Sequence, residues 1–260
     1  MIEIKEISFA YEQKKVLDHI SFGLEKGDIC AVMGLNGSGK STLLKLIAKL
    51  LPLKEGKISI ASHSIDEYTT KALARKIAYV PQQQEIVFDF SVYDTIMMGR
   101  NPYQNRWEIE NNTDKEIVNS VMEQCNLTHL QERMLTQLSG GEMQRTLIAR
   151  AMAQQAPVML LDEPLSNLDI VHKYEIMDIL SGLNRSHKIT IMIILHDFHF
   201  AKQYTNKTLL LKESMLQQFG ITHTILMPEI IKNVFNLSEE YEIDSFGNVL
   251  KNHIFAFQNK

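Results

Sequence analysis

The fold is decided by one stretch, Gly34-Leu35-Asn36-Gly37-Ser38-Gly39-Lys40-Ser41-Thr42, which fits the pattern G-x-x-x-x-G-K-[ST]. Residues 29–33 before it form a short apolar run, which predicts a buried strand. Residues 41–50 after it carry apolar side chains at helical spacing. Strand, Gly-rich turn and helix, in this order, are the setting in which the pattern forms a phosphate-binding loop.

The residue types of this loop suit a nucleoside triphosphate. Glycines let backbone N–H groups turn toward phosphate oxygens, and the following helix directs its positive end at them. We expect Lys40 to reach the β- and γ-phosphates and the Ser41 hydroxyl to ligate Mg²⁺. A Gly-rich turn that merely carries a lysine is the alternative, but the complete spacing and both flanks argue against it. The residues expected to bind nucleotide here are Gly34, Asn36, Gly37, Ser38, Gly39, Lys40, Ser41 and Thr42.

Composition narrows the class of protein. The chain has 260 residues, 45% of them hydrophobic, and a formal net charge of −4. Its length allows one large α/β domain or a core with a subdomain, and its charge provides no basic field for nucleic acid. Cys30 and Cys125 lie far apart without a C-x-x-C pattern, so we predict neither disulfides nor a zinc site.

The sequence predicts no membrane-spanning segment, because no run approaches the length of about eighteen apolar residues that a span requires. Residues 1–7 alternate apolar and polar side chains, which is typical of a strand and not of a signal peptide. We therefore expect a soluble, cytoplasmic protein that would reach a membrane only by docking to another chain.

The remaining patterns predict an α/β fold with a P-loop NTPase core. Residues 1–33 indicate antiparallel strands, and residues 57–60, 77–80 and 208–211 indicate further strands. The continuous apolar runs at 158–161 and 189–195 are typical of parallel strands buried on both faces. From 91 to 150 the spacing becomes helical, beginning with a capping box at Ser91 and Asp94. We predict a catalytic core over 1–82 and 154–260, with a mixed, mainly parallel sheet and an antiparallel β subdomain, and an inserted helical subdomain over 83–153.

Two carboxylates follow the predicted strand at 158–161. Asp162 and Glu163 stand at its C-terminal end, where parallel sheets bind ligands. Asp162 is suited to hold Mg²⁺ through its coordinated water, and Glu163 to polarise the water that attacks the γ-phosphate. Two solvent-facing acids at a strand end are the alternative.

A second anion site is predicted at residues 138–145, which begin a helix. Ser139 and Glu142 form another capping box, whereas Gly140 and Gly141 leave backbone N–H groups uncovered. An ordinary capped helix start would not need two glycines.

Residues 138–145 resemble the signature sequence of ABC-transporter ATPase domains, and the resemblance extends over nearly the whole chain as a single domain, 1–260. Residues 34–42 are similar to the Walker A motif, 158–163 to the Walker B motif and 166–169 to the D-loop. The resemblance implies ATP hydrolysis coupled to transmembrane transport. It also implies a head-to-tail dimer with a second copy, in which each ATP lies between 34–42 of one chain and Ser139, Gly140 and Gly141 of the other.

The resemblance assigns roles to single residues. Gln82 matches the Q-loop glutamine, His196 the switch histidine and Tyr11 the aromatic ring that stacks on adenine. A polar rim residue is the plain alternative for His196, and core packing is the alternative for Tyr11. The implied catalytic residues are Lys40, Gln82, Glu163 and His196, and the implied Mg²⁺ ligands are Ser41, Gln82 and Asp162.

Residues 99–103, together with Trp107, resemble the G-R-x-P-[YH] pattern of one importer subgroup. That subgroup energises uptake of iron–siderophore complexes, haem and cobalamin, with a substrate-binding protein as an indirect partner. The family places a permease helix beside the Q-loop, so residues 82–107 are the implied docking face. A helix break at residues 101–103 and a buried tryptophan are the alternative.

One departure concerns residues 212–215, Lys-Glu-Ser-Met, where the subgroup usually has a Gly-containing turn. Without glycine, we expect another turn type or a longer loop. Two other functions stay open: a soluble single-cassette ABC ATPase not coupled to transport, for example in cluster assembly, and a phosphotransferase, against which the signature argues.

Overall fold

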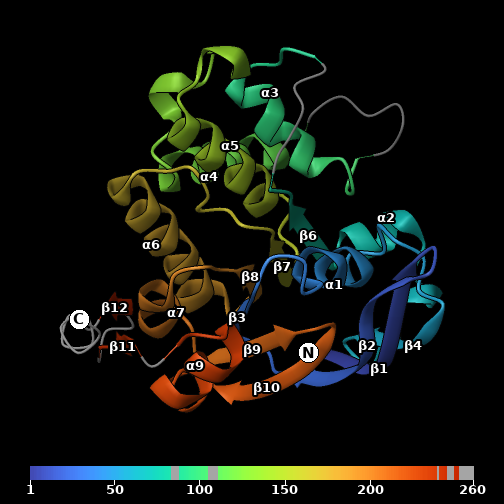
Figure 1. Ribbon diagram of the computed structural model, residues 1–260. Helices are drawn as coiled ribbons and strands as arrows, with labels where there is room; N and C mark the ends of the chain where they lie inside the picture. The colour runs from blue at the N-terminus through green and yellow to red at the C-terminus, as the bar shows by residue number, and fades with distance from the viewer. Residues whose placement is uncertain (83–87, 105–110, 239, 245–248, 252–260) are drawn as a thin grey trace. The chain divides into compact units, whose positions relative to one another are not determined.

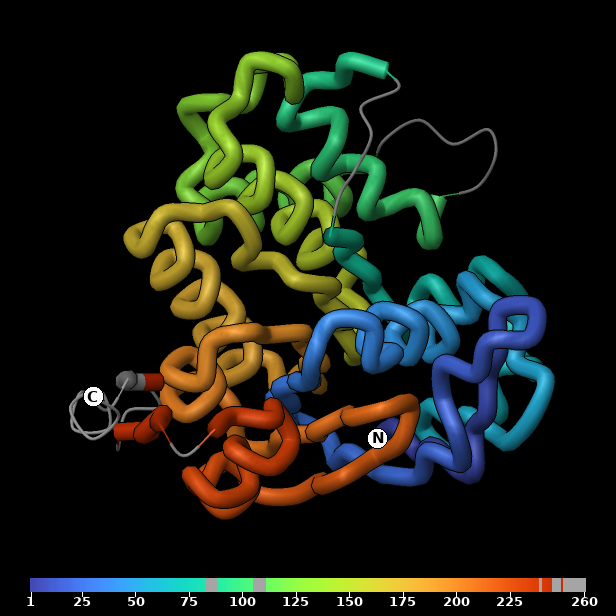
Figure 2. Tube along the Cα trace, viewed as in Figure 1, coloured from blue at the N-terminus to red at the C-terminus, as the bar shows by residue number. Residues whose placement is uncertain are grey.

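The computed structural model describes residues 1–82, 88–104, 111–238, 240–244 and 249–251 (Figure 1). The chain divides into two compact units, Met1–Ser64 with Met192–Lys260, and Ile65–Ile191. Figure 2 traces each unit by residue number. In the part of the chain that is described, no helix has both the length and the apolar character that a membrane crossing requires.

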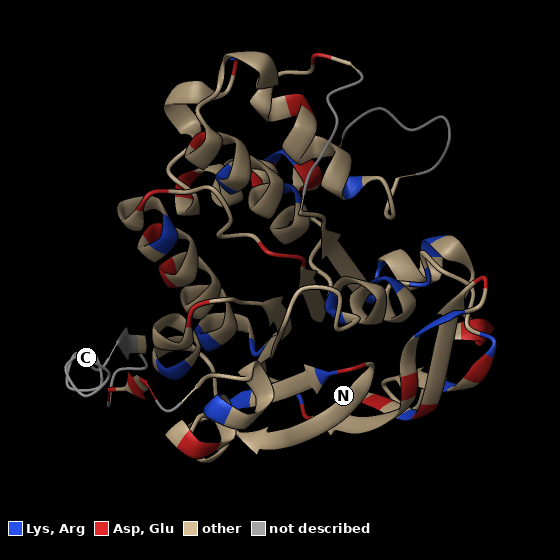
Figure 3. Ribbon diagram, viewed as in Figure 1, with Lys and Arg blue, Asp and Glu red and all other residues tan. Residues whose placement is uncertain are grey.

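In the first unit, alternating side chains build the predicted antiparallel sheet. Its strands run in the order β2-β1-β4-β5; they are β1 (Ile2–Tyr11), β2 (Lys14–Leu24), β4 (Glu55–Ile60) and β5 (His63–Ser64). Ile2 and Ile4 of β1 are buried while Glu3 between them is exposed, as expected when successive side chains point to opposite faces. Basic and acidic residues both occur along these strands (Figure 3), so the sheet presents no single-signed field.

The strand before the phosphate loop lies in the same unit. β3 (Ile29–Gly34) is buried along its whole length and pairs in parallel with β9 (Lys207–Lys212). The predicted helix after the loop is α1 (Lys40–Ile47), which ends three residues earlier than the pattern indicated. β8 (Thr190–Ile194) has residues in both units, and within the first unit the Leu195 N–H donates to the Val32 carbonyl at 3.3 Å.

The C-terminal part of the first unit is mainly short helices. They are α7 (Phe198–Tyr204), α8 (Thr222–Ile225) and α9 (Pro228–Phe235), followed by strands β11 (Tyr241–Ile243) and β12 (Val249–Lys251). Phe198 of α7 and Phe235 of α9 pack edge to face with their ring centroids 5.0 Å apart.

The turn between β9 and β10 (Met215–Ile221) corrects the sequence prediction. Met215 still pairs with Lys212, so the loop has only two residues, and both have positive φ, 51° at Glu213 and 68° at Ser214. This is the backbone of the turn that best matches strand twist. The Ser214 carbonyl accepts the Asp18 N–H at 2.8 Å. The expectation of a longer loop was wrong, because tertiary contacts hold non-glycine residues in the left-handed region.

The second unit contains two parallel strands and a long helix. β6 (Ile77–Val80) pairs in parallel with β7 (Val158–Leu161), and η1 (Ile65–Glu67) and α2 (Thr70–Ala74) precede them. The long helix α6 runs over Ile170–His187. Asp169 caps it by accepting the His172 N–H at 3.0 Å.

Between Ser91 and Ala153, the described residues form helices joined by turns: α3 (Val92–Met97), η2 (Met98–Arg100), α4 (Asn112–Gln124), η3 (Thr128–Leu130), η4 (Leu135–Gln137) and α5 (Gly140–Ala153). The Ser91 hydroxyl accepts the Asp94 N–H at 3.0 Å, as expected, but it donates its own proton to the Asp94 carboxylate. The limits of the predicted subdomain, 83–153, stay a prediction.

A buried arginine holds these helices together. The Arg100 Nε donates to Asp114 of α4 at 2.8 Å, and its Nη1 donates to the Ala153 carbonyl at the end of α5 at 2.7 Å. Its guanidinium also lies 4.2 Å from the centroid of the Tyr103 ring. Gly99 beside it has no room for a side chain, because a Cβ would collide with the Arg150 carbonyl. The predicted helix break at 101–103 therefore follows a close crossing of η2 and α5.

Substituting alanine for Gly99 is expected to lower the free energy of unfolding by about 1–3 kcal/mol, the usual cost of overpacking. The matched control is Gly182→Ala, in the interior of α6, where a Cβ would meet nothing within 4 Å. That change should be neutral or stabilise by up to about 1 kcal/mol, because alanine favours helix. Urea denaturation of both variants measures the difference, and equal effects would contradict the close crossing.

Candidate functional site

The phosphate loop has the backbone that an anion cradle requires. Gly39, at the start of α1, has φ of 100°, and a Cβ there would lie 2.6 Å from the Val16 carbonyl oxygen. The same addition at Gly34 would collide with the Leu211 carbonyl. Only glycine fits both places without strain. The backbone of β2 and of β9 lies so close to the loop that no side chain has room there.

The polar atoms of this loop suit phosphate. Lys40 is only 5% exposed, and its Nζ donates to the Gly34 and Leu35 carbonyls at 2.9 and 3.0 Å. The Ser38 Oγ is buried and has no hydrogen-bond partner among the described residues. A buried cation and an unsatisfied hydroxyl beside a helix N-terminus are a favourable setting for phosphate oxygens.

Two further predicted residues lie in the first unit. Tyr11, at the end of β1, keeps 45% of its surface exposed, and its ring meets only the edge-to-face Phe9 ring among the aromatic contacts of the described chain, with centroids 4.9 Å apart. Such a ring retains surface that another flat ring could cover. His196 is exposed and directly follows Leu195, which is hydrogen-bonded to the strand that carries the loop.

The carboxylates lie in the second unit, at the end of β7. Asp162 is 2% exposed, and its Oδ2 accepts the Tyr79 hydroxyl proton at 3.0 Å. Burial, reinforced by the nearby Asp162 charge, raises the pKa of Tyr79 well above its usual range. The phenol therefore stays protonated and acts as the donor of this bond.

Glu163 forms a second cluster in the same unit. Its Oε2 accepts hydrogen bonds from the Gln82 side chain at 2.8 Å and from the Ser166 hydroxyl at 3.0 Å. Its backbone has φ of 50°, a costly conformation for a residue with a side chain. Strain of this kind at a candidate catalytic position supports a functional role, and the structure brings Gln82 and Glu163 together as the motifs suggest.

The predicted capping box at the signature is confirmed. The Ser139 hydroxyl accepts the Glu142 N–H at 3.3 Å, and the Glu142 carboxylate accepts the Ser139 N–H at 2.8 Å. The Ser139 hydroxyl also donates to this carboxylate at 2.8 Å. The backbone N–H of Ser139 first, and then its hydroxyl, lower the pKa of Glu142, so its charge persists where the helix dipole favours an anion. Gly140 is exposed, and α5 begins there.

A histidine that the sequence analysis missed packs against the signature. A Cβ on Gly141 would lie 2.5 Å from the ring of His172 in α6. The His172 Nδ1 lies 2.8 Å from the Glu175 carboxylate, which also binds the Arg145 guanidinium at 2.5 Å. The D-loop helix and the signature helix are thus joined by one small ionic cluster. The spacing of three residues from Asp169 was the only signal for it in the sequence.

The predicted Mg²⁺ ligands suit that ion by type. Ser41, Gln82 and Asp162 offer oxygen donors with one carboxylate, and Mg²⁺ keeps several waters and accepts few protein oxygens. The described residues contain no group of three or more His, Cys, Asp or Glu side chains that could hold a metal. Ser41 lies in the first unit, and Gln82 and Asp162 lie in the second; their joint action remains a prediction. Trp107 falls outside the described residues.

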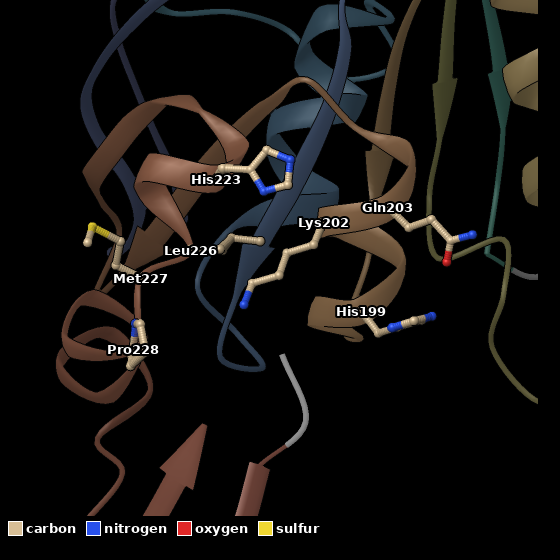
Figure 4. A pocket seen from close by; sticks show the side chains of 7 residues that line it. All are labelled: His199, Lys202, Gln203, His223, Leu226, Met227 and Pro228. Atoms are coloured by element: carbon tan, nitrogen blue, oxygen red, sulfur yellow. The ribbon is translucent and has the colours of Figure 1, made fainter. Parts of the chain in front are cut away.

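A separate cavity of about 510 Å³ lies in the first unit, and the sequence did not predict it (Figure 4). Its volume is within the range of small-molecule pockets. Its lining comes from α7, from α8 and from the chain that leads into α9: His199, Lys202, Gln203, His223, Leu226, Met227 and Pro228. None of the predicted nucleotide-binding residues lines it.

Comparison with known proteins places this geometry in a family. The family model described as "ABC transporter" matches residues 17–166. The petrobactin import ATP-binding protein of Bacillus anthracis is 36% identical over 95% of this chain and 89% of its own length. The iron(3+)-hydroxamate import ATP-binding protein of Bacillus subtilis is 30% identical over 95% and 92%.

A solved structure of an inward-facing ABC transporter of the metal-chelate type contains a similar chain. It is 32% identical, the match covers 97% of this chain and 98% of that one, and the TM-score is 0.82. The predicted α/β fold, with its mainly parallel sheet and antiparallel β subdomain, is confirmed. With a family model over more than half of its length and relatives along nearly all of it, the chain belongs to the ABC transporter family and is an ATP-binding subunit that couples ATP hydrolysis to transport.

Proposed function

We propose that this chain is the ATP-hydrolysing subunit of an importer for an iron–siderophore, haem or cobalamin-type substrate. The observation that carries the proposal is likeness along almost the whole chain to a petrobactin import protein. The pattern at residues 99–103 supports it, because it resembles that of the importer subgroup. The chain would act at the cytoplasmic face of the membrane, bound to permease subunits.

The nucleotide chemistry would be divided among the motif residues. Lys40 neutralises β- and γ-phosphate charge, and Tyr11 stacks on adenine. Ser41, Gln82 and Asp162 would hold Mg²⁺, which when bound draws charge from the phosphate oxygens.

The attacking water would be prepared by a carboxylate and an imidazole. Glu163 polarises it, and His196 orients it beside the γ-phosphate. In this proposal the Glu163 carboxylate exchanges its 2.8 Å hydrogen bond from Gln82 for one from the water, and Gln82 would then be available to hold Mg²⁺.

A second copy of the chain would complete the site. Ser139, Gly140 and Gly141 direct the N-terminal N–H groups of α5 at the γ-phosphate held by the partner's phosphate loop. ATP closes the dimer and product release opens it, which moves the attached permease between its two orientations.

The docking face proposed for the permease, residues 82–107, includes an exposed aromatic pair. Phe88 is 70% exposed, and its ring centroid lies 6.2 Å from that of Phe90. Asp89 between them accepts the Thr136 hydroxyl proton at 2.7 Å and the Thr136 N–H at 3.2 Å. The pair is thus attached to Thr136 of η4, and η4 directly precedes the signature at residues 138–145. An apolar helix of a permease could cover the two rings there.

Reconstitution with a permease and its substrate-binding protein tests the function. We expect ATP-dependent uptake of one member of a panel of siderophores, haem and cobalamin into proteoliposomes, with ATPase activity stimulated by the permease. Glu163→Gln should bind ATP and trap the closed dimer, but support no uptake, because the water loses its base.

The contrary outcomes separate the alternatives. An ATPase that no permease stimulates would favour the soluble single-cassette function, and a phosphorylated small-molecule product would favour a phosphotransferase. Full hydrolysis by Glu163→Gln would remove that residue from its assigned role.

The docking face is tested by the double variant Phe88→Ser and Phe90→Ser. Co-purification with the permease should fall at least about tenfold, since two exposed aromatic rings are typical anchors of an interface. Ile221→Ser is the matched control, because Ile221 is also an exposed apolar residue and lies outside residues 82–107. Equal retention of the permease by both proteins would exclude this face.

The two signature glycines should respond differently to alanine. Gly141→Ala forces a Cβ onto the His172 ring, whereas a Cβ on Gly140 would meet only Leu168 at 3.8 Å. We expect Gly141→Ala to lower ATPase activity at least about tenfold, a loss of ~1.4 kcal/mol, and Gly140→Ala to lower it less. Adding His172→Ala should restore part of the Gly141→Ala loss. If it restores none, packing against His172 is not the reason for this glycine.

A further inference from the structure

One partly buried hydrogen bond joins the Asp162 carboxylate, the proposed Mg²⁺ ligand, to the neighbouring strand. Asp162 directly follows β7, and its N–H donates to the Val80 carbonyl of β6 at 2.9 Å. Its Oδ2 accepts the Tyr79 hydroxyl proton at 3.0 Å. Main chain and side chain of Asp162 are therefore both attached to the last two residues of β6.

The parallel register places the two side chains together. Tyr79 pairs with Leu160, and Val80 pairs with Leu161, so the chain after β7 continues past the tyrosine hydroxyl. Asp162 is almost fully buried, and a carboxylate in such a place needs fixed donors. A carboxylate rotates readily about its terminal bond, and a donor on Oδ2 restricts that rotation.

Tyr79 is suited to this task because a phenol hydroxyl is a hydrogen-bond donor, and its bond to Asp162 joins the ends of two paired strands. Its position is also outside the motifs that identify the family, and two residues separate it from Gln82.

We propose that Tyr79 is a positioning residue, which orients the Asp162 carboxylate for the Mg²⁺ that accompanies ATP. The inference rests on the proposed nucleotide chemistry. Residues that hold a metal ligand in place commonly contribute ten- to hundredfold to metal affinity. Tyr79 itself touches neither nucleotide nor metal in this scheme.

The test is the variant Tyr79→Phe, which removes one oxygen atom and keeps the ring. Binding of a fluorescent ATP analogue is measured in EDTA and then across a Mg²⁺ titration. We expect unchanged affinity in EDTA and about a tenfold rise in the Mg²⁺ concentration that gives half of the full response. Tyr241→Phe in β11 is the control for loss of a phenol elsewhere and should leave the titration unchanged.

A second variant keeps the test decisive. Tyr79→Met also lacks the donor, should give the same shift and replaces Tyr79→Phe if that protein does not fold. In an Asp162→Asn background, Tyr79→Phe should change the Mg²⁺ response no further, because the carboxylate that it orients is gone.

The outcomes distinguish this inference from the transport proposal. An unchanged Mg²⁺ titration in Tyr79→Phe overturns it, and so does a loss of ATP binding in EDTA, which would show a structural role only. A wild-type protein that binds ATP with Mg²⁺ but is stimulated by no permease would remove the transport proposal and leave this one standing. A wild-type ATP affinity that ignores Mg²⁺ would overturn the inference itself.

Discussion

The site depends on keeping the charge of Lys40 inside the protein. An almost fully buried ammonium group is costly unless it is hydrogen-bonded, and here the Gly34 and Leu35 carbonyls accept its protons. Those carbonyls are available only because the loop folds back over the start of α1, along a path that glycine allows. The same path leaves the Ser38 hydroxyl without a partner among the described residues. The loop therefore keeps a positive charge and an open hydroxyl ready for an anion.

Polar groups elsewhere in the site also depend on where buried strands end. Asp162 follows β7, and His196 follows β8 and Leu195. A strand buried on both faces cannot hold such side chains along its length, so they are confined to its carboxyl end. The positions of Asp162 and His196 thus follow from burial of the apolar strands before them. Their chemistry follows from the groups that surround the carboxyl end of each strand.

In the second unit, close contacts between helices restrict which residues can stand at two positions. Gly99 allows η2 to cross α5, and Gly141 allows the signature helix to approach His172. Glu163 is held with positive φ by its neighbours Gln82 and Ser166. In each case a close contact or a strained backbone fixes the position of the neighbouring groups, as expected where the structure serves a reaction.

The sequence by itself determined the fold class, the phosphate loop, the carboxylate pair and the capped signature helix. These features are local, because hydrogen-bond capping, glycine turns and apolar runs act over a few residues. Only the tertiary structure decided which side chains meet. Tyr79 with Asp162, His172 with Gly141 and Arg100 with Asp114 are pairs from distant segments, and no periodicity predicts them. The turn at Glu213 and Ser214 shows the same limit, since contacts with β2 stabilise a conformation that local preference disfavours.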